Sequence, residues 1–425
     1  MKVLIIGSGG REHAIAAALA KSPRVTELHC TPGNGGVAEI ASCHTITATD
    51  IDGVLELAMR IEPDWVVVAP DDPLVMGMVD ALNGAGFRTF GPRKAAARLE
   101  GSKAFSKEFM KRHNIPTAAH ETFDNADKAV AYIKNKNTYP AVIKCDGLAL
   151  GKGVIIAQDE QEAIEAIAAM FKGKFGDAGK QVVIEEFLQG KEVTVLAFTD
   201  GKSVIPMPPS TDHKRALDGD KGLNTGGMGV VAGALPYWND EIAAECMKNI
   251  FMPTIEGMAS EGCAFKGCLY FGLMLTENGV KVIEYNCRFG DPEAQAILPL
   301  LETDLMDIIE AVWQERLSEF EVRFSDKSSA CVVMASGGYP EHYTVGYEII
   351  GVHRAQSLNE VTVYHAGTKT NGLALMTTGG RVLGVTAVAE DLTSAVAKAY
   401  YGVRLITFRN AHFRNDIGAA AIGNT

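Results

Sequence analysis

The 425-residue sequence has few cysteines, and their arrangement does not indicate a disulfide framework or a zinc site. The eight cysteines are scattered, and the closest pair, Cys263 and Cys268, does not form a CxxC motif. No cysteines and histidines cluster at the spacing of zinc ligands. A core of this size needs no disulfide support. We therefore interpret the cysteines as small buried residues in a reducing cytoplasm.

The sequence also lacks a long apolar run and an excess of positive charge. No stretch is long enough to span a bilayer, and Met1-Lys2 leads straight into an apolar strand, so we expect neither a membrane segment nor a signal peptide. Lysine and arginine total 40 against 52 aspartates and glutamates, a net charge of −12. This balance disfavours nucleic-acid binding, whereas a few local cations suffice for a small phosphorylated ligand.

The remaining composition is that of an ordinary globular protein, with 47% hydrophobic and 22% charged residues. Strand and helix patterns alternate along the chain, which predicts an α/β fold. We predict an N-terminal doubly wound parallel-sheet domain over residues 1–101. A central body follows over 102–121 and 188–327, with a small inserted lobe at 122–187. A small mixed α/β domain over 328–425 completes the chain.

Two local patterns predict loops and turns. The stretch from Ser210 to Gly229 is polar, rich in glycine and without clear periodicity, and we predict a long functional loop there. Gly379-Gly380 lies between two apolar segments, which predicts a hairpin turn.

The most informative motif is VIEYNCRFGDPEAQ, from Val282 to Gln295. Side chains alternate along a strand, so Glu284, Asn286 and Arg288 should share one face. A carboxylate, an amide oxygen and a fork-shaped guanidinium at one strand end suit a hard metal ion that carries phosphate. A strand end with solvated charges is the alternative.

Two glycine-rich segments predict anion sites. GSGGREHA, Gly7 to Ala14, joins a strand to a helix, whose N-terminal N–H groups can bind a phosphate. Glu12 stands where the dinucleotide fingerprint has its third glycine, and no acidic residue ends the second strand, so NAD binding is disfavoured. Lys144 precedes a glycine-rich loop, 147–153, that joins two strands and therefore differs from a Walker loop. We predict a flap over phosphates, with a solvated hairpin tip as the alternative.

Two further motifs are weaker when taken alone. IEEFLQGKE, from Ile184 to Glu192, ends an apolar strand and can offer backbone groups to a planar base. DHKR gathers charged side chains that begin at Asp212, and NTGGMG lets the backbone approach a ligand closely. His213 is a candidate general base, although a solvated loop histidine is the commoner case.

Together these motifs resemble the ATP-grasp superfamily and, more narrowly, the glycinamide ribonucleotide synthetase family, also called phosphoribosylamine–glycine ligases. The resemblance is near end to end and includes PGNGG and EGSKAFSKEFMKRHNIPT besides the motifs above. CRFGDPE combined with DHKR and NTGGMG is its most specific part. The resemblance implies a central ATP-grasp body. It also implies ATP-dependent ligation of glycine to 5-phosphoribosylamine through glycyl phosphate, with Mg²⁺ or Mn²⁺, in purine biosynthesis.

The resemblance implies roles for three groups of residues. ATP would be bound by Lys103, Lys144, Gly147, Gly151, Lys152, Gly153, Glu185, Glu186, Phe187, Leu188 and Glu192. Glycine and 5-phosphoribosylamine would be bound by Gly7, Gly9, Gly10, Arg11, Gly33, Asn34, Asp71, Asp212, Lys214, Arg215, Gly226, Gly227, Arg288, Asp291 and Glu293. The metal ion would be bound by Glu284 and Asn286. The catalytic side chains would be Arg288, Lys144 and Asp212.

Departures from the family pattern affect contacts rather than the reaction. Asp71-Asp72 replaces a glutamate followed by a small residue, and Cys145 and Leu150 stand where we expect alanine. The alternatives to this function are another ATP-grasp ligase or carboxylase that acts on a phosphoribosylated substrate, an NAD-dependent oxidoreductase, and a non-catalytic nucleotide sensor. We expect a cytoplasmic monomer, although the residues do not fix the oligomeric state.

Overall fold

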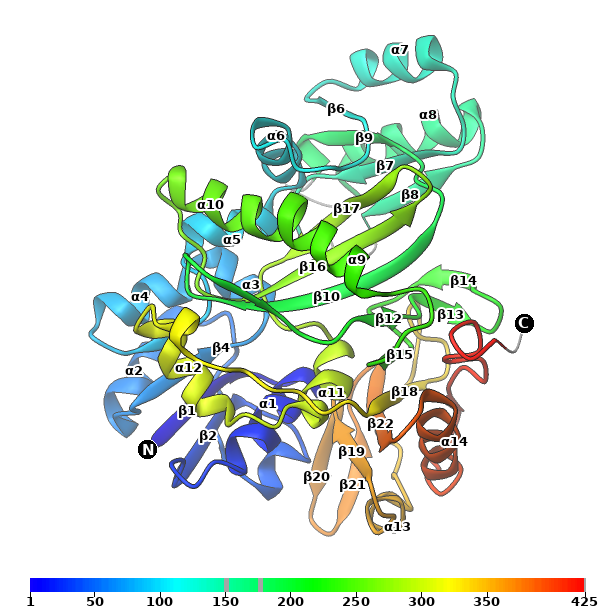
Figure 1. Ribbon diagram of the computed structural model, residues 1–425. Coiled ribbons are helices and arrows are strands. Elements are labelled where there is room, and N and C mark those ends of the chain that lie inside the picture. Colours follow the sequence, from blue (N-terminus) through cyan, green and yellow to red (C-terminus); the bar gives the residue numbers. More distant parts are fainter. Residues whose placement is uncertain (149–152, 175–178, 424–425) are drawn as a thin grey trace.

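The computed structural model describes residues 1–148, 153–174 and 179–423, and it has the predicted α/β architecture (Figure 1). The N-terminal part is a parallel sheet in the order β3-β2-β1-β4-β5. Its strands are β1 (Lys2–Gly7), β2 (Glu27–Pro32), β3 (Ser42–Cys43), β4 (Trp65–Val68) and β5 (Thr89–Phe90). Its helices are α1 (Gly10–Ala20), α2 (Ile51–Ile61), α3 (Asp71–Met76), α4 (Met78–Gly84) and α5 (Lys94–Gly101).

Both faces of this sheet are buried, which explains why residues 3–6 of β1 are all apolar. Val3 and Ile5 belong to a core shared with α1 and α12 (Leu305–Trp313). Leu4 and Ile6 belong to the core on the other face, with α2 and α4. Because alternate side chains point to opposite faces, helices are needed on both sides, as in a doubly wound fold.

The small lobe is a separate antiparallel sheet in the order β6-β9-β7-β8, at the top of Figure 1. Its strands are β6 (His120–Phe123), β7 (Ala141–Cys145), β8 (Val154–Ala157) and β9 (Val182–Glu186). Helices α7 (Ala126–Lys136) and α8 (Glu160–Ala169) cover one face, where Ile143 and Ile184 are buried. Strand alternation therefore turns Lys144 and Glu185 to the other face.

The largest sheet has the order β17-β16-β10-β12-β15-β18-β22-β19, with β11 beside β10 and β23 beside β18. Its strands are β10 (Lys191–Thr199), β11 (Val204–Pro206), β12 (Ser210–Asp212), β15 (Gly229–Ala232), β16 (Gly267–Thr276), β17 (Gly279–Asn286), β18 (Ser328–Ser336), β19 (Val361–His365), β22 (Arg381–Ala389) and β23 (Ala411–His412). The division into domains at residue 328 is our proposal, and the hydrogen-bonded sheet is continuous across it because β15 pairs with β18.

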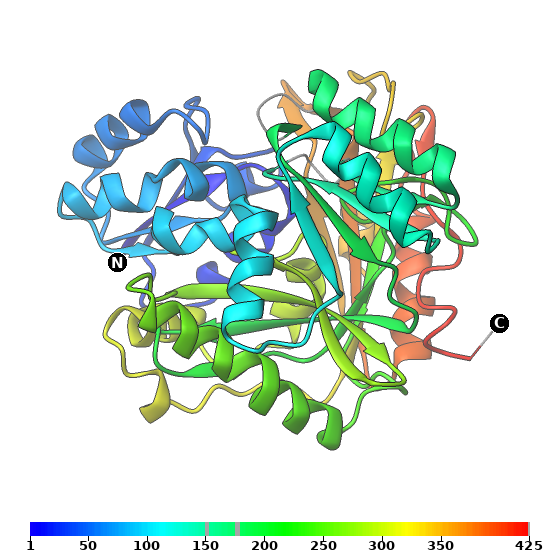
Figure 2. The ribbon, with the colours of Figure 1, turned by 90° about the horizontal axis from the view of Figure 1, so that it is seen from above.

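The central strands have a core on each face. Val193 and Val195 pack with α9 (Asp240–Cys246) and α10 (Met252–Ser260), whereas Phe198 joins the core beneath the N-terminal sheet. The remaining helices are α6 (Lys103–Arg112), α11 (Glu293–Ile297), α13 (Val352–Gln356) and α14 (Leu392–Val403). Figure 2 shows the N-terminal sheet (blue) and the C-terminal segment (red) on opposite sides of the molecule. Within the described ranges, no helix combines the length and apolarity needed to cross a membrane.

Two local predictions are wrong. Residues 210–229 are not one loop, since they contain β12, the start of β15, and a hairpin of β13 (Arg215–Leu217) with β14 (Lys221–Asn224). The hairpin at Gly379-Gly380 does not form, because β20 (Thr368–Asn371) pairs instead with β21 (Ala374–Thr377). An added Cβ on Gly367 would lie 2.6 Å from the Gly379 Cα. These glycines therefore allow two segments to approach closely rather than forming a turn.

A pair of buried histidines joins helix α1 of the N-terminal part to β19 of the C-terminal part. His13 Nδ1 accepts a hydrogen bond from the His365 backbone N–H at 2.8 Å, and the two ring centroids are 5.5 Å apart. Burial, with a smaller effect of the neighbouring His365, lowers the pKa of His13 to about 3. Burial also lowers the pKa of His365 to about 4. Both rings are therefore neutral at physiological pH.

This pair predicts a loss of stability in acid. Below the usual histidine pKa, the unfolded chain takes up protons at both positions while the folded chain does not. Stability should therefore fall as the pH drops from 6.5 towards 4, by up to about 1.4 kcal/mol per pH unit for each histidine. His13→Asn keeps an acceptor but cannot titrate, so its unfolding free energy should depend less steeply on pH. Urea unfolding at several pH values measures this slope, and His342→Asn on the exposed surface is the control. Equal slopes for His13→Asn and the wild type would contradict the assignment.

Candidate active site

A cavity of about 1080 Å³ lies between the small lobe, the central sheet, the N-terminal part and the C-terminal segment. Most of the predicted site residues line it. They are Arg11, Asp71, Lys103, Lys144, Gly153, Glu185, Glu186, Phe187, Leu188, Glu192, Asp212, Lys214, Arg215, Gly226, Glu284, Asn286, Arg288, Asp291 and Glu293. These residues come from the N-terminal part, the small lobe and the central body, and they meet only in the folded chain.

The other predicted residues lie elsewhere. Gly7, Gly9, Gly10, Gly33, Asn34, Gly147 and Gly227 do not line the cavity. Gly151 and Lys152 lie outside the described residues. Asn34 has a bonded role instead, because its amide donates to the Gly9 and His365 carbonyls and its oxygen accepts from two N–H groups.

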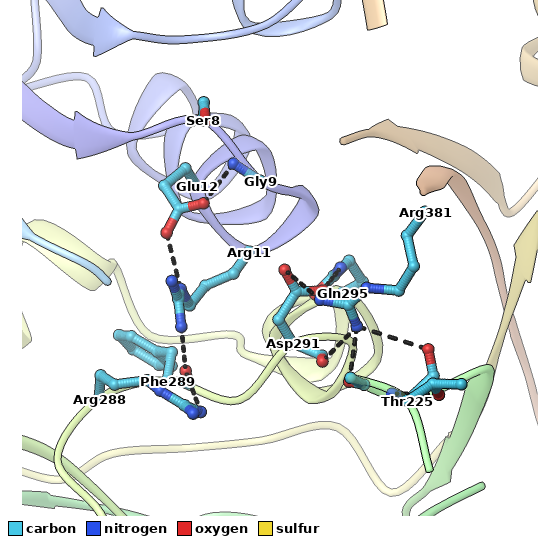
Figure 3. Close-up of polar contacts among 12 residues, drawn as sticks. Ser8, Gly9, Arg11, Glu12, Thr225, Arg288, Phe289, Asp291, Gln295 and Arg381 are labelled. Carbon is cyan, nitrogen blue, oxygen red and sulfur yellow. Dashed lines mark hydrogen bonds and ion pairs between the residues drawn. The ribbon is translucent and has the colours of Figure 1, made fainter. Parts of the chain in front are cut away.

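The predicted anion site at the start of α1 is partly filled by the protein itself. Glu12 Oε2 accepts a hydrogen bond from the Gly9 backbone N–H at 2.5 Å, and its Oε1 accepts one from Arg11 Nε at 2.7 Å (Figure 3). An added Cβ on Gly7 would lie 2.5 Å from Glu12 Cγ. The carboxylate that breaks the dinucleotide fingerprint thus caps the helix where a pyrophosphate would bind.

A β-bulge sets which side chains of β17 face the cavity. Gly272 pairs with Glu284, but the next pair is Leu273 with Val282, so Ile283 is an extra residue. Val282 is fully buried on the core side, and beyond the bulge Tyr285 takes up that side. The bulge therefore reverses the alternation and turns Glu284, and after it Asn286, into the cavity.

Arg288 is fixed by acidic and carbonyl groups. Its Nη2 lies 3.1 Å from Glu100 Oε1 and donates to Asn286 Oδ1 at 3.1 Å, while its Nη1 donates to the Phe289 carbonyl. Burial raises the pKa of Glu100 to about 7, although Arg288 opposes this rise. Burial would also raise the pKa of Asp71, but Arg288 and Arg11 bring it below its usual value.

Lys144 belongs to a buried triad rather than standing free. Glu185 forms ion pairs with Lys144 at 3.0 Å and with Lys107 at 2.9 Å. All three side chains are nearly inaccessible to solvent. Lys107 also donates to Thr117 Oγ1 at 2.7 Å. Burial lowers the pKa of Lys107 to about 8, with Glu185 opposing. The triad ties α6 to strands β7 and β9 of the small lobe, at the wall of the cavity.

Glu284 is ionised by its surroundings. Burial alone would raise the pKa of its carboxyl group, but nearby lysines lower it to about 2. These lysines are Lys214, Lys144 and Lys103. Lys214 lies 3.6 Å from Glu284 and also forms a short ion pair with Glu192. A fixed anion surrounded by cations is thus present at the predicted strand end.

Two further carboxyl groups line the same cavity. Burial, reinforced by the neighbouring Glu293, raises the pKa of Asp212 well above its usual range. Burial also raises the pKa of Glu293. Asp212 Oδ1 is inaccessible to solvent and accepts no hydrogen bond from the described residues.

The prediction of a solvated loop is wrong for His213, and both of its ring nitrogens form hydrogen bonds with the backbone. It is buried, its Nδ1 pairs with the Gly229 carbonyl at 3.1 Å, and its Nε2 accepts from the Gly418 N–H at 3.1 Å. Burial lowers its pKa, so the ring is neutral. Arg414 clamps the same hairpin by donating to Asp220 Oδ1 at 2.7 Å and to the Arg215 carbonyl at 3.2 Å. The C-terminal segment therefore holds the hairpin that carries Lys214.

Several charged residues that line the cavity were not predicted from the sequence, among them Glu100, Lys107, Arg381 and Arg414. One signal was available, because Lys107 follows Lys103 by four residues and so shares its helix face. Glu100 lies in the last turn of α5, and its partners are distant in sequence. Arg381 and Arg414 belong to the last part of the chain, where no motif for the chemistry had been recognised.

Family models match nearly the whole chain. Residues 1–100 match the phosphoribosylglycinamide synthetase N domain, residues 101–294 its ATP-grasp (A) domain, and residues 329–420 its C domain. A solved biotin carboxylase of Campylobacter jejuni shares the fold at 14% identity, with a TM-score of 0.74 over 97% of this chain and 92% of that one. Fold and cavity together define an ATP-grasp enzyme.

Full-length relatives narrow this class. A phosphoribosylamine–glycine ligase of Brucella melitensis is 45% identical over 99% of this chain and 98% of its own length. The trifunctional purine biosynthetic protein adenosine-3 of Homo sapiens is 46% identical over 99% of this chain and 42% of its own length. The solved phosphoribosylamine–glycine ligase of Thermotoga maritima has a TM-score of 0.86 at 33% identity, covering 98% of this chain and 100% of that one. The chain belongs to the phosphoribosylamine–glycine ligase family, which confirms the family, fold class and enzyme class predicted from the motifs.

Proposed function

We propose that the protein joins glycine to 5-phosphoribosylamine at the expense of ATP, as a step of purine biosynthesis. Glycine first accepts the terminal phosphoryl group of ATP and becomes glycyl phosphate. The amine of 5-phosphoribosylamine then attacks the acyl carbon, and phosphate leaves. The products are glycinamide ribonucleotide, ADP and phosphate.

One observation carries this proposal: Glu284, Asn286 and Arg288 lie at one strand end in a cavity that is also lined by the three lysines that lower the pKa of Glu284. A migrating phosphoryl group carries dense negative charge, so positioning and charge stabilisation dominate its transfer. Arg288 presents a planar fork that fits a carboxylate or an acyl phosphate. Glu100 and Asn286 both bind the Nη2 end of that guanidinium and hold it in place.

The residues present fit Mg²⁺ or Mn²⁺. Glu284 supplies an ionised carboxylate and Asn286 an amide oxygen, both of which are hard donors. Mg²⁺ keeps several waters and needs few protein ligands. When bound, the ion would neutralise phosphate charge and orient the phosphates. Among the described residues, no group of three or more histidine, cysteine, aspartate or glutamate side chains offers another such site.

The two ends of the cavity suit different substrates. At the end of β9, Glu186 pairs with Lys281 at 2.9 Å, and the partly exposed Phe187 gives an apolar wall for adenine. Lys103 donates to the Gly147 carbonyl at 2.8 Å and so fixes the base of the glycine-rich flap. At the other end, Arg288 and Asp212 face the space for glycine and the amine. The β13–β14 hairpin excludes water from the acyl phosphate.

The test is phosphate release by the purified protein with ATP and Mg²⁺. Release should require glycine and 5-phosphoribosylamine together, and mass spectrometry should detect glycinamide ribonucleotide. Bicarbonate or formate in place of glycine should not support turnover. Release without glycine, or with bicarbonate alone, would overturn the proposal in favour of a carboxylase.

We also propose a cytoplasmic location, because all eight cysteines are unpaired.

A further inference from the structure

Arg381, the first residue of β22, reaches from the C-terminal part of the chain to two loops of the central body. Its Nη1 donates to the Gly226 carbonyl at 2.7 Å and to the Asp291 carbonyl at 2.6 Å. Its Nη2 forms an ion pair with Asp291 Oδ2 at 3.2 Å. Figure 3 shows this guanidinium between the turn that follows Thr225 and the loop that holds Asp291. One side chain thus ties together two loops that both border the cavity.

The turn at Gly226-Gly227 fits tightly against this guanidinium. An added Cβ on Gly226 would lie 3.1 Å from Arg381 Cζ. Gly227 has a φ of +110°, and an added Cβ there would lie 2.7 Å from Asp212 Oδ1 and 2.5 Å from Pro292 Cδ. The turn therefore lies between Arg381 and Asp212, and the positive φ and close contacts at Gly227 require glycine there. A shift of Arg381 would move the turn relative to Asp212.

A β-bulge aims the side chain at these loops. Along the pairing of β18 with β22, Met334 pairs with Leu383, but Ala335 pairs with Arg381, so Val382 is an extra residue. Val382 is fully buried in the core of the sheet. Bulges re-aim side chains beside functional sites. Because of the bulge, the side chain of Arg381 points to these loops, and only 20% of it is exposed to solvent.

Asp291 extends the arrangement to the N-terminal part. Its Oδ1 accepts from Gln295 Nε2 at 2.7 Å. An added Cβ on Gly10 would lie 2.3 Å from the same Gln295 nitrogen, and one on Gly9 would lie 3.0 Å from Asp291 Oδ2. The loop of Asp291 therefore contacts the start of α1 on one side and the Arg381 guanidinium on the other.

We propose that Arg381 is a positioning residue for acyl transfer from glycine to the amine. It holds the Gly226-Gly227 turn and Asp291 in register with Asp212, and it acts through these groups rather than on the reacting atoms. The C-terminal part of the chain thereby completes the acceptor end of the active site. This inference rests on the proposed function, and it assigns no role to Arg381 at the nucleotide end.

Kinetics of two variants test the inference. Arg381→Ala should lower kcat by about 10²-fold, because displacement of a site by about 1 Å has effects of that size. Arg381→Lys keeps the charge but loses the fork, and its kcat should fall by about tenfold. The KM for ATP should change less than about threefold in both. Arg354→Ala on the exposed side of α13 is the matched control and should behave as wild type. A KM for ATP that rises as steeply as kcat falls would indicate a merely structural role and overturn the proposal.

Two further readouts separate this inference from the proposed function. Hydrogen exchange of the intact protein should speed up at residues 225–228 and 290–294 in Arg381→Ala, with β16 and β17 unchanged. Millimolar methylguanidinium should restore part of the kcat of Arg381→Ala and none of the kcat of Arg381→Lys. Unchanged exchange, or no rescue of an active enzyme, would overturn the positioning role. An inactive wild type with the local exchange change would instead overturn the proposed reaction and leave the anchoring intact.

Discussion

Arg288→Ala is expected to lower kcat by about 10²–10³-fold while ATP affinity changes by less than about threefold, as for the loss of a preorganised charge stabiliser. Arg288 lines the cavity and is held by Glu100, Asn286 and the Phe289 carbonyl. The proposed phosphoryl transfer and acyl transfer both develop negative charge near this guanidinium. Alanine removes the charge, whereas the lysines and β9 at the nucleotide end remain.

The variant also leaves Glu100 buried without its cationic partner, and this effect can be separated from catalysis. Because the pKa of Glu100 is already about 7, the carboxyl group can take up a proton, which limits the destabilisation. A double variant, Arg288→Ala with Glu100→Gln, should recover thermal stability but not kcat. Steady-state kinetics, nucleotide titration and thermal unfolding give the three quantities. Exposed Arg316→Ala is the control. A kcat that recovered together with stability would show that Arg288 only supports the fold.

The predicted residues that lie together in the cavity at the end of β17 are the ones encoded locally. Glu284, Asn286 and Arg288 are spaced two apart, and strand alternation places them on one side. Strand alternation alone would also put Val282 on the cavity side. In the structure, however, Val282 faces the opposite side and is buried in the core. The bulge at Ile283 depends on pairing with β16, a partner that periodicity within one strand cannot reveal.

The residues that sequence missed act through distant partners. Glu100 accepts from the Cys287 N–H, 187 positions along the chain, and Arg381 donates to Asp291, 90 positions away. A single charged residue at the end of a helix or strand is normally solvated, so the local sequence does not reveal that this one is buried. Burial of the charge becomes understandable once both ends of the contact are placed together.

The wrong predictions also have a physical cause. Residues 210–229 show little periodicity because β13 and β14 form a separate two-stranded hairpin, on which Leu217 and Leu223 remain exposed. Arg414, His213 and the C-terminal backbone stabilise it with hydrogen bonds instead of an apolar core. Glu12 interrupts the dinucleotide fingerprint and on that ground disfavoured NAD binding. The hydrogen bond that it accepts from the Gly9 N–H could not be foreseen from the fingerprint alone.

Glu284→Gln is expected to raise the Mg²⁺ concentration for half-maximal activity by about tenfold or more and to lower kcat. The side chain keeps its shape but loses the negative charge that hard cations prefer. The pKa of the carboxyl group, about 2, means that the wild type is ionised throughout the working pH range. Glutamine therefore removes a charge that is always present, and the cations around it, Lys214 among them, then repel the metal ion more strongly.

Activity measured against free Mg²⁺ at saturating ATP tests this ligand assignment, and exposed Glu277→Gln is the control. A second measurement does not depend on turnover: Mn²⁺ titrated with ADP and followed by electron paramagnetic resonance should bind more weakly to Glu284→Gln. Lys214 pairs with both Glu284 and Glu192, so Glu192→Gln tests whether the loss of any nearby charge suffices. If Glu192→Gln shifts the Mn²⁺ titration as far as Glu284→Gln, the effect is one of general charge and Glu284 is not a ligand. If only Glu284→Gln shifts it, the carboxylate at the bulge of β17 holds the ion.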